Sequence, residues 1–399
     1  MNYPKGLLFA VIQLMVLTLL LQGCSIPGRL AAVPKEETAQ AQIPGLSGVR
    51  YLANGDMTQF MVDLKAGISS ELAYRAKTGQ QGPLPPANYL AISGGGDDGA
   101  YGAGLLCGWT KAGNRPEFKL VTGISTGALI APFAFLGPKY DDKLREVYTN
   151  STHKDIMEDR GLHAVVFDDA LADNRPLWEL LQKHISAEML REVAQEYKKG
   201  RILLVGTTDL DSRRAVIWNL TKIADSGHPQ ALDLFRKLMM ASAAIPGAFP
   251  PAMIDVEVNG KPYQEMHVDG GTVAQVFVYP PSIKLKEAAQ QMGVERERNL
   301  YLIRNSRIDP DWSEVERRSL SILGKAVLSL IRTQGIGDMY RIYLNSQRDG
   351  IDFNLAFIPA SFNELHVEDF DKNYMQKLFL NGYNASAKGY PWAKVPPGY

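Results

Sequence analysis

The sequence predicts an α/β protein with three layers, in which helices cover both faces of a mainly parallel central sheet. Apolar, strand-like runs alternate with helical patterns along most of the 399 residues, which is typical of parallel sheets. A glycine-rich loop follows one such run at Ser93, and a Gly-x-Ser-x-Gly turn around Ser125 joins another run to an apolar helix. Functional residues at strand ends are usual in this architecture.

The N-terminal residues carry the pattern of a secretion signal. Lys5 precedes a largely apolar stretch, residues 7–21, which is short for a membrane span and suits a signal-peptide core. The stretch runs into Leu21-Gln22-Gly23-Cys24, which resembles the lipobox of bacterial lipoproteins. That resemblance implies a signal peptide over residues 1–23, a lipidated Cys24 and, because Ser25 follows, the outer membrane; a short uncleaved anchor is the alternative.

Residues 24–85 are expected to form a tether followed by an accessory helix. Prolines and glycines between Pro27 and Gly48 favour an extended linker that lifts the domain off the bilayer. Residues 57–75 have apolar residues at helical spacing. The run of residues 82–86 (GPLPP) then marks a boundary, with a catalytic domain predicted over 86–305 and a mostly helical extension, packed on the same domain, over 306–399.

The first strand of that domain, residues 88–93, leads into a glycine loop formed by Gly94, Gly95 and Gly96. Consecutive glycine N–H groups with no side chains in the way form a nest that binds anions. A phosphate and the oxyanion of an acyl-transfer intermediate both fit this property. The spacing matches neither a dinucleotide-binding fingerprint nor a Walker loop, and a flexible turn without a ligand is the simpler alternative.

The turn around Ser125 has the pattern of a nucleophile elbow. The apolar run of residues 119–124 enters it, and an apolar helical segment follows. Gly123 and Gly127 are expected because strand and helix leave no room there for a Cβ atom. The helix would also direct its N-terminal N–H groups toward charge developing beside Ser125. The alternative is a buried turn whose serine only caps the helix.

Asp269 is the strongest candidate for a catalytic partner. It follows a hydrophobic, turn-rich stretch over residues 254–266 and is itself followed by Gly270 and Gly271, so its carboxylate can project from a strand end while the backbone turns away. An Asp-Gly hairpin turn is the alternative. A Ser-Asp-His triad in α/β-hydrolase order leaves only His366 as a base, whereas His267 is expected to be structural.

The remaining chain supplies further elements in alternation. Helices are expected over 140–148, 174–184, 187–199, 231–242 and 312–345, the last broken near Gly335 and Gly337, and strands over 201–208, 216–220 and 300–305. Leu328, Leu330 and Ile331 could contact a membrane, but burial in the core is the preferred interpretation.

Composition limits the choice of partners. Lys plus Arg and Asp plus Glu are equal at 43 each, so no basic excess indicates nucleic acid. Cys107 is the only cysteine besides Cys24, which excludes a disulfide within the mature chain and favours a small core residue. No His/Cys cluster has metal-ligand spacing, and Asp97 and Asp98 are expected to lie in a solvated loop or helix cap, so no metal and no cofactor are predicted.

Together these motifs resemble the patatin-like phospholipase family. The resemblance is carried by the glycine loop, by residues 123–127 (GISTG), by residues 269–271 (DGG) and by residues 242–251 (SAAIPGAFPP). It implies a three-layer patatin-like fold and a Ser-Asp dyad, with Ser125 as nucleophile and Asp269 as general base. The N–H groups of the glycine loop, chiefly those of Gly95 and Gly96, would hold the oxyanion.

One position departs from the family pattern. The family usually has Arg or Lys just before the fourth glycine of the loop, where this chain has Asp98. The expected function is a membrane-tethered serine acyl hydrolase acting on lipid or phospholipid esters, with phospholipid preference less secure because of Asp98. A catalytically weak lipid-binding envelope lipoprotein is the alternative from another class.

Overall fold

The structure, a computed structural model, describes residues 28–160, 168–309, 312 and 314–399. Its strands are β1 (Arg50–Leu52), β2 (Ala87–Ile92), β3 (Leu120–Ile124), β4 (Glu158–Asp159), β5 (Ala172–Asp173), β6 (Ile202–Asp209), β7 (Arg214–Asn219), β8 (Ala252–Val258), β9 (Lys261–Asp269), β10 (Arg298–Arg307) and β11 (Asp352–Ile358). Its α-helices are α2 (Thr58–Lys77), α3 (Gly99–Lys111), α4 (Thr126–Leu136), α5 (Asp141–Asn150), α6 (His153–Ile156), α8 (Arg175–His184), α9 (Ala187–Lys198), α10 (Leu220–Asp225), α11 (Ala231–Ser242), α12 (Leu285–Gln291), α13 (Ser319–Asp349) and α14 (Lys372–Ser386). Short 3₁₀ turns are η1 (Lys35–Gln40), η2 (Gly96–Asp98), η3 (Pro138–Tyr140) and η4 (Gly270–Thr272).

The predicted α/β class with a mainly parallel sheet is confirmed. The strand order is β1-β7-β6-β3-β2-β10-β11, and the five strands β6, β3, β2, β10 and β11 run parallel to one another. β7 and β1 add an antiparallel edge, and the β8–β9 hairpin joins the sheet through β6. The carboxyl ends of β2 and β3 therefore lie side by side, which brings the glycine loop next to the Ser125 turn.

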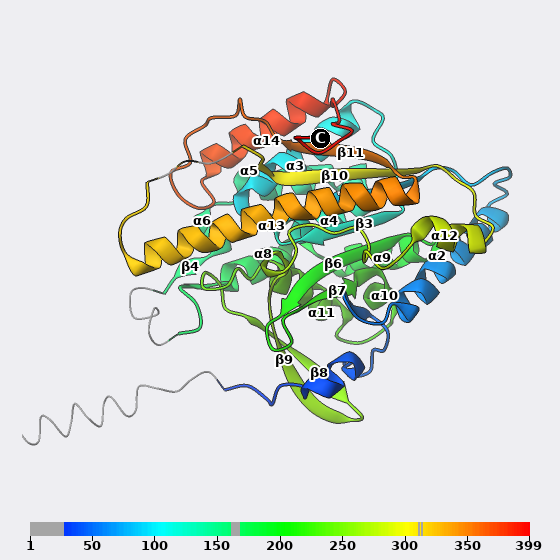
Figure 1. The fold of residues 1–399 in the computed structure, drawn as a ribbon, viewed down its shortest axis with the longest axis horizontal. Helices are drawn as coiled ribbons and strands as arrows, with labels where there is room; N and C mark the ends of the chain where they lie inside the picture. Colours follow the sequence, from blue (N-terminus) through cyan, green and yellow to red (C-terminus); the bar gives the residue numbers. More distant parts are fainter. Residues whose placement is uncertain (1–27, 161–167, 310–311, 313) are drawn as a thin grey trace, which may run out of the picture.

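Helices cover both faces of this sheet (Figure 1). Along β2, Leu90 and Ile92 belong to a core shared with α3, α4, α9, α11 and α14, whereas Tyr89 and Ala91 belong to a second core shared with α2 and α13. Side chains alternate between the faces of a strand, so a short apolar run buried on both sides specifies a central strand. Cys107 is buried in the first core, as its apolar surroundings predict.

The expectation of an extended linker before residue 48 is wrong for its described part. Val33, Ile43 and Val49 are buried in the first core, and Gln42 forms a β-bridge with Glu257. β1 follows directly and pairs with β7. The segment therefore packs against the domain and does not hold it at a distance. Residues 1–27, with the predicted signal peptide and Cys24, lie outside the described residues.

The C-terminal part differs from the sequence expectation in three respects. β11 pairs in parallel with β10, so the extension supplies a strand of the sheet as well as helices. α13 runs through Gly335 and Gly337 without the predicted break. Leu328 and Leu330 are 60% and 70% exposed, so the preferred core assignment is wrong for both. Within the described ranges, no helix is both long and apolar enough to cross a bilayer.

Candidate active site

Ser125 occupies the predicted elbow between β3 and α4. Its backbone has φ 55° and ψ −127°, a conformation that costs a non-glycine residue of order 1–3 kcal/mol. A Cβ on Gly123 would lie 2.3 Å from the Gly127 carbonyl oxygen, and one on Gly127 would lie 2.2 Å from that of Ile92. The prediction that both positions require glycine is therefore confirmed.

Ser242 holds the elbow in place. Its Oγ accepts a hydrogen bond from the Ser125 backbone N–H at 3.0 Å and donates one to the Gly206 carbonyl oxygen at 2.7 Å. The strained turn is thus tied to β6 through a buried hydroxyl. No local sequence pattern predicts this role for Ser242. Its only signal was its place as the first residue of the SAAIPGAFPP motif.

The sheet topology brings Asp269 beside Ser125. β3 and β9 occupy the same edge of β6 in succession: Ile124 pairs with Gly206, and Asp269 pairs with the next residue, Thr207. The residue after the end of β3 and the last residue of β9 therefore meet. The Ser125 side chain lies close enough to the Asp269 carboxylate to affect its pKa.

Burial makes Asp269 an unusually basic carboxylate. The side chain is almost enclosed, with the residue 4% exposed. Desolvation raises its pKa from 3.8 to about 7, although the Ser125 side chain and a hydrogen bond from the Gly271 N–H at 2.6 Å oppose the rise. A carboxylate with a pKa near neutrality can accept a proton from a serine hydroxyl far better than an ordinary aspartate can.

The glycine loop presents two backbone donors to the same space. Gly94 is not available, because its N–H donates to the Gln275 carbonyl oxygen at 3.0 Å. In the part of the chain that the structure describes, the N–H groups of Gly95 and Gly96 donate to no protein acceptor. A Cβ on Gly95 would lie 2.0 Å from the Asn305 carbonyl oxygen, so glycine is required for this approach. Gly95 and Gly96 are therefore the donors that suit an oxyanion.

Neither candidate histidine contacts the dyad. His366 Nε2 lies 2.6 Å from the Asp97 carboxylate, which raises the pKa of His366 to about 9. Tyr374 donates to Asp98 at 2.6 Å. The alternative triad with His366 is therefore not formed. Asp98 occupies the N-cap position of α3, one of the two placements expected for this pair. Both aspartates also tie the glycine loop to the segment around α14, which the sequence does not indicate.

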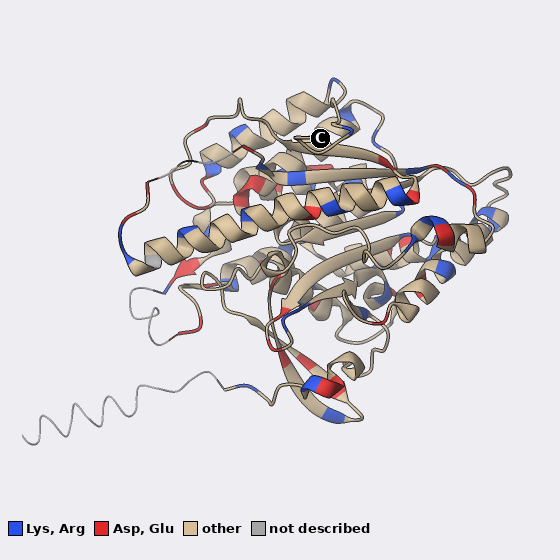
Figure 2. Ribbon diagram, viewed as in Figure 1, with Lys and Arg blue, Asp and Glu red and all other residues tan. Residues whose placement is uncertain are grey.

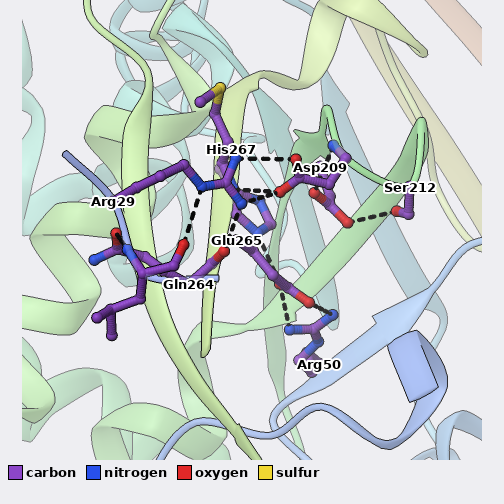
Figure 3. A network of polar contacts seen from close by, with 10 residues as sticks. Arg29, Arg50, Asp209, Ser212, Gln264, Glu265 and His267 are labelled. Carbon is purple, nitrogen blue, oxygen red and sulfur yellow. Dashed lines mark hydrogen bonds and ion pairs between the residues drawn. The ribbon is translucent and has the colours of Figure 1, made fainter. Parts of the chain in front are cut away.

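His267 belongs to a buried polar network on β9 (Figure 3). Its ring nitrogens lie 2.8 Å from Thr207 Oγ1 and 3.0 Å from Glu265 Oε2, and Arg50 pairs with Glu265 through two hydrogen bonds. Burial alone would raise the pKa of Glu265, but His267 and Arg50 lower it to about 2. The network fixes β1 and β6 to the strand that ends at Asp269, as the structural interpretation of His267 predicts.

Ser125 and Asp269 open into a cleft of about 800 Å³. Its wall contains loop residues, the last residues of β10, and the face of α13 with Leu328 and Ile331. Basic and acidic residues are interspersed over the whole molecule (Figure 2). In the cleft, the acids Asp97 and Asp98 come from the glycine loop, whereas β10 and α13 contribute arginines. The cleft therefore combines the Ser125–Asp269 pair, apolar side chains of α13 and a group of cations.

Comparison with known proteins gives a family match and likenesses to solved structures. Residues 90–280 match the family model of patatin-like phospholipases. Among solved structures, VipD from Legionella pneumophila matches with a TM-score of 0.34 and 12% sequence identity, over 76% of this chain and 66% of that chain. The match thus spans slightly less than two thirds of the VipD chain. No curated protein matches this sequence.

Proposed function

We propose that this chain, whose residues 90–280 form a patatin-like phospholipase domain, is a serine acyl hydrolase that cleaves lipid esters with a Ser125–Asp269 dyad. The family match indicates lipid acyl hydrolysis in general. The observation that carries the finer assignment is the placement of a strained elbow serine beside a buried carboxylate whose pKa is about 7. Phospholipase A and lysophospholipase reactions both belong to this chemistry.

The reaction proceeds through an acyl-enzyme. Ser125 Oγ attacks the ester carbonyl carbon while its proton passes to Asp269, and the N–H groups of Gly95 and Gly96 stabilise the oxyanion. The intermediate collapses, and the departing alcohol takes the proton from Asp269. Water then attacks the acyl-Ser125 ester and gives a proton to Asp269. When this second intermediate collapses, the bond to Ser125 Oγ breaks, Oγ takes the proton back from Asp269, and the fatty acid leaves.

Exposed apolar side chains of α13, in and near the cleft, support a lipid substrate. Leu328 lies in the cleft wall and is 60% exposed, and Ile322, Leu323 and Leu330 are exposed on the same helix. Exposed apolar side chains that gather near a site mark a surface for an apolar ligand or a membrane. Acyl chains or a bilayer surface are suitable occupants.

A fluorophosphonate probe tests the assignment directly. We expect wild-type protein to be labelled and to hydrolyse a short-chain ester, and Ser125→Ala to lose both properties. Ser329→Ala, which removes a different serine hydroxyl at the cleft, is the matched control and keeps its label. Folded wild-type protein that neither labels nor hydrolyses esters would favour the alternative of a lipid-binding envelope lipoprotein.

The proposal includes a lipid anchor at Cys24 that holds the enzyme on a bacterial envelope membrane, with the outer membrane as the expected location. Its support is the lipobox-like sequence before Cys24 and the serine that follows it. Expression of Cys24→Ala tests it by fractionation. We expect the variant to be released from membranes or to accumulate as an unprocessed precursor, whereas unchanged membrane association would contradict the anchor.

A further inference from the structure

Arg304 is a buried cation in the cleft wall that has no hydrogen-bond partner among the described residues. It lies near the carboxyl end of β10 and is only 3% exposed, yet it borders the same cleft as Ser125. Among the described residues, no atom accepts a hydrogen bond from its guanidinium group, and its Nε is fully enclosed with no partner. Buried charges in proteins are normally paired, because an unpaired one costs several kcal/mol.

The surroundings of Arg304 increase this cost. Burial and the nearby charge of Arg332 lower the pKa of Arg304 to about 10, so it remains protonated at neutral pH. Asp338 attracts it, but that carboxylate accepts hydrogen bonds from the Gln275 N–H, from Gln334 and from Arg341. Arg304 and Arg332 therefore border the same cleft, and the carboxylate that attracts Arg304 is committed to other donors.

α13 is shaped to leave room for this guanidinium group. A Cβ on Gly335 would lie 2.6 Å from Arg304 Nη1 and 3.1 Å from Gln275 Cβ. A Cβ on Gly337, two residues further along the same helix, would meet nothing within 4 Å. Gly335 thus makes the space that Arg304 occupies, although glycine in a helix interior costs about 1 kcal/mol relative to alanine.

Arg304 is connected to the oxyanion donors through the residue that follows it. The next residue, Asn305, donates its N–H to Ser93 Oγ at 2.8 Å and its side-chain amide to the Ser93 carbonyl oxygen at 3.0 Å. Its own carbonyl group packs on Gly95. The end of β10 therefore braces the glycine loop, and a group held by Arg304 would lie in the cleft that this loop lines.

We propose that Arg304, assisted by Arg332, forms an anion subsite that binds the phosphate group of the ester substrate. This inference rests on the proposed acyl hydrolase function. It supplies from β10 and α13 the cation that the glycine loop lacks at Asp98. A phosphate oxygen between the two guanidinium groups would relieve their repulsion and pair a buried charge, and arginine suits such oxyanions because its donors match their geometry.

A pair of soluble esters measures this preference. Dihexanoyl glycerophosphate and dihexanoylglycerol share their acyl chains and differ by the phosphate. We expect the ratio of their kcat/KM values to favour the phosphate ester in wild type and to fall about 10- to 100-fold in Arg304→Met, the loss expected for a hydrogen-bonded charge pair. Arg304→Lys retains part of the ratio. Arg175→Gln, which removes an exposed arginine, is the control for net charge.

Two further variants separate binding from folding. Gly335→Ala should displace the guanidinium group and lower the ratio, whereas Gly337→Ala should leave it at the wild-type value. Thermal unfolding distinguishes anion binding by Arg304 from a purely structural role of this residue. Because Arg304 has no partner to lose, Arg304→Met should unfold at a temperature no lower than wild type, and millimolar inorganic phosphate should stabilise wild type more than the variant.

The outcomes are distinct from a failure of the proposed function. Absence of any ester hydrolysis would refute the hydrolase assignment and this inference with it. Hydrolysis with the same ester ratio in wild type and Arg304→Met would overturn the subsite alone. Stabilisation by inorganic phosphate without a preference between the esters would overturn the substrate role as well, because it would assign Arg304 to free phosphate.

Discussion

Replacing Asp269 with asparagine should abolish turnover and at the same time stabilise the fold. Asparagine keeps an acceptor for the Gly271 N–H but cannot take a proton from Ser125. Loss of a general base lowers rates by about 10²- to 10⁴-fold. The stabilising effect arises because the folded wild-type protein must bury a charge that asparagine does not carry.

The size of this effect follows from the pKa of Asp269. The folded protein holds the proton up to about pH 7, whereas the unfolded chain releases it near the ordinary value of 3.8. Between these values the unfolded state binds fewer protons, so wild-type stability falls as pH rises from about 4 to about 7. The full difference corresponds to about 4 kcal/mol, of which about 2–3 kcal/mol develops between about pH 5 and pH 8.

Denaturant unfolding of wild type and Asp269→Asn at about pH 5 and about pH 8 measures this difference in unfolding free energy. Asp255→Asn, on the exposed side of the neighbouring strand β8, controls for the loss of one carboxylate. The pH profile of wild-type kcat/KM should rise tenfold per pH unit to a plateau above about pH 7. A stability difference that is equal at pH 5 and pH 8 would refute the reasoning, because the carboxylate would then ionise in its ordinary range.

Three other substitutions test the supports of the site. Ser242→Ala leaves the Ser125 N–H buried without its acceptor, so unfolding free energy should fall by about 1–3 kcal/mol and turnover with it; retained turnover would contradict the elbow brace. Glu265→Gln breaks a buried pair with Arg50 and should cost about 3–5 kcal/mol in chemical denaturation, whereas a change below about 1 kcal/mol would show that the pair is not needed. Leu330→Ser should slow hydrolysis of vesicle lipids but not of a soluble ester. If the variant and wild type hydrolyse vesicle lipids at equal rates, Leu330 on α13 does not contact the membrane.

The parts of the site that sequence patterns predict are those specified by neighbouring residues. Gly123, Ser125 and Gly127 lie within one turn, and the steric reason for both glycines is local. Asp269 could be placed at a strand end because its two following glycines indicate a sharp turn. The observed turn is the 3₁₀ segment η4, not a hairpin.

The parts that escaped prediction depend on distant residues. Ser242 contacts Ser125 across 117 positions of sequence, and no periodicity indicates such a bond. Segment 28–52 has the prolines and glycines of a linker, but it pairs with β7 and packs in the core. In α13, two glycines suggest a break, yet each costs a helix only about 1 kcal/mol, and packing of Met339 and Ile342 against the second core outweighs that cost.

The cleft contains two buried groups of opposite charge, and the burial of each one lowers the stability of the folded protein. Among the described residues, Asp269 is buried with a hydrogen bond from Gly271 but with no cation beside it, and Arg304 is buried with no acceptor. The two charges do not neutralise each other, since no ion pair joins them in the described residues. Substrate relieves both of these unfavourable burials. The Ser125 proton neutralises Asp269 during attack, and an oxyanion of the substrate pairs with Arg304. The Asp269→Asn and Arg304→Met substitutions should therefore each stabilise the fold. The first should lower the rate of hydrolysis and the second should lower the selectivity for the phosphate ester, so the same buried charges that destabilise the fold support its chemistry.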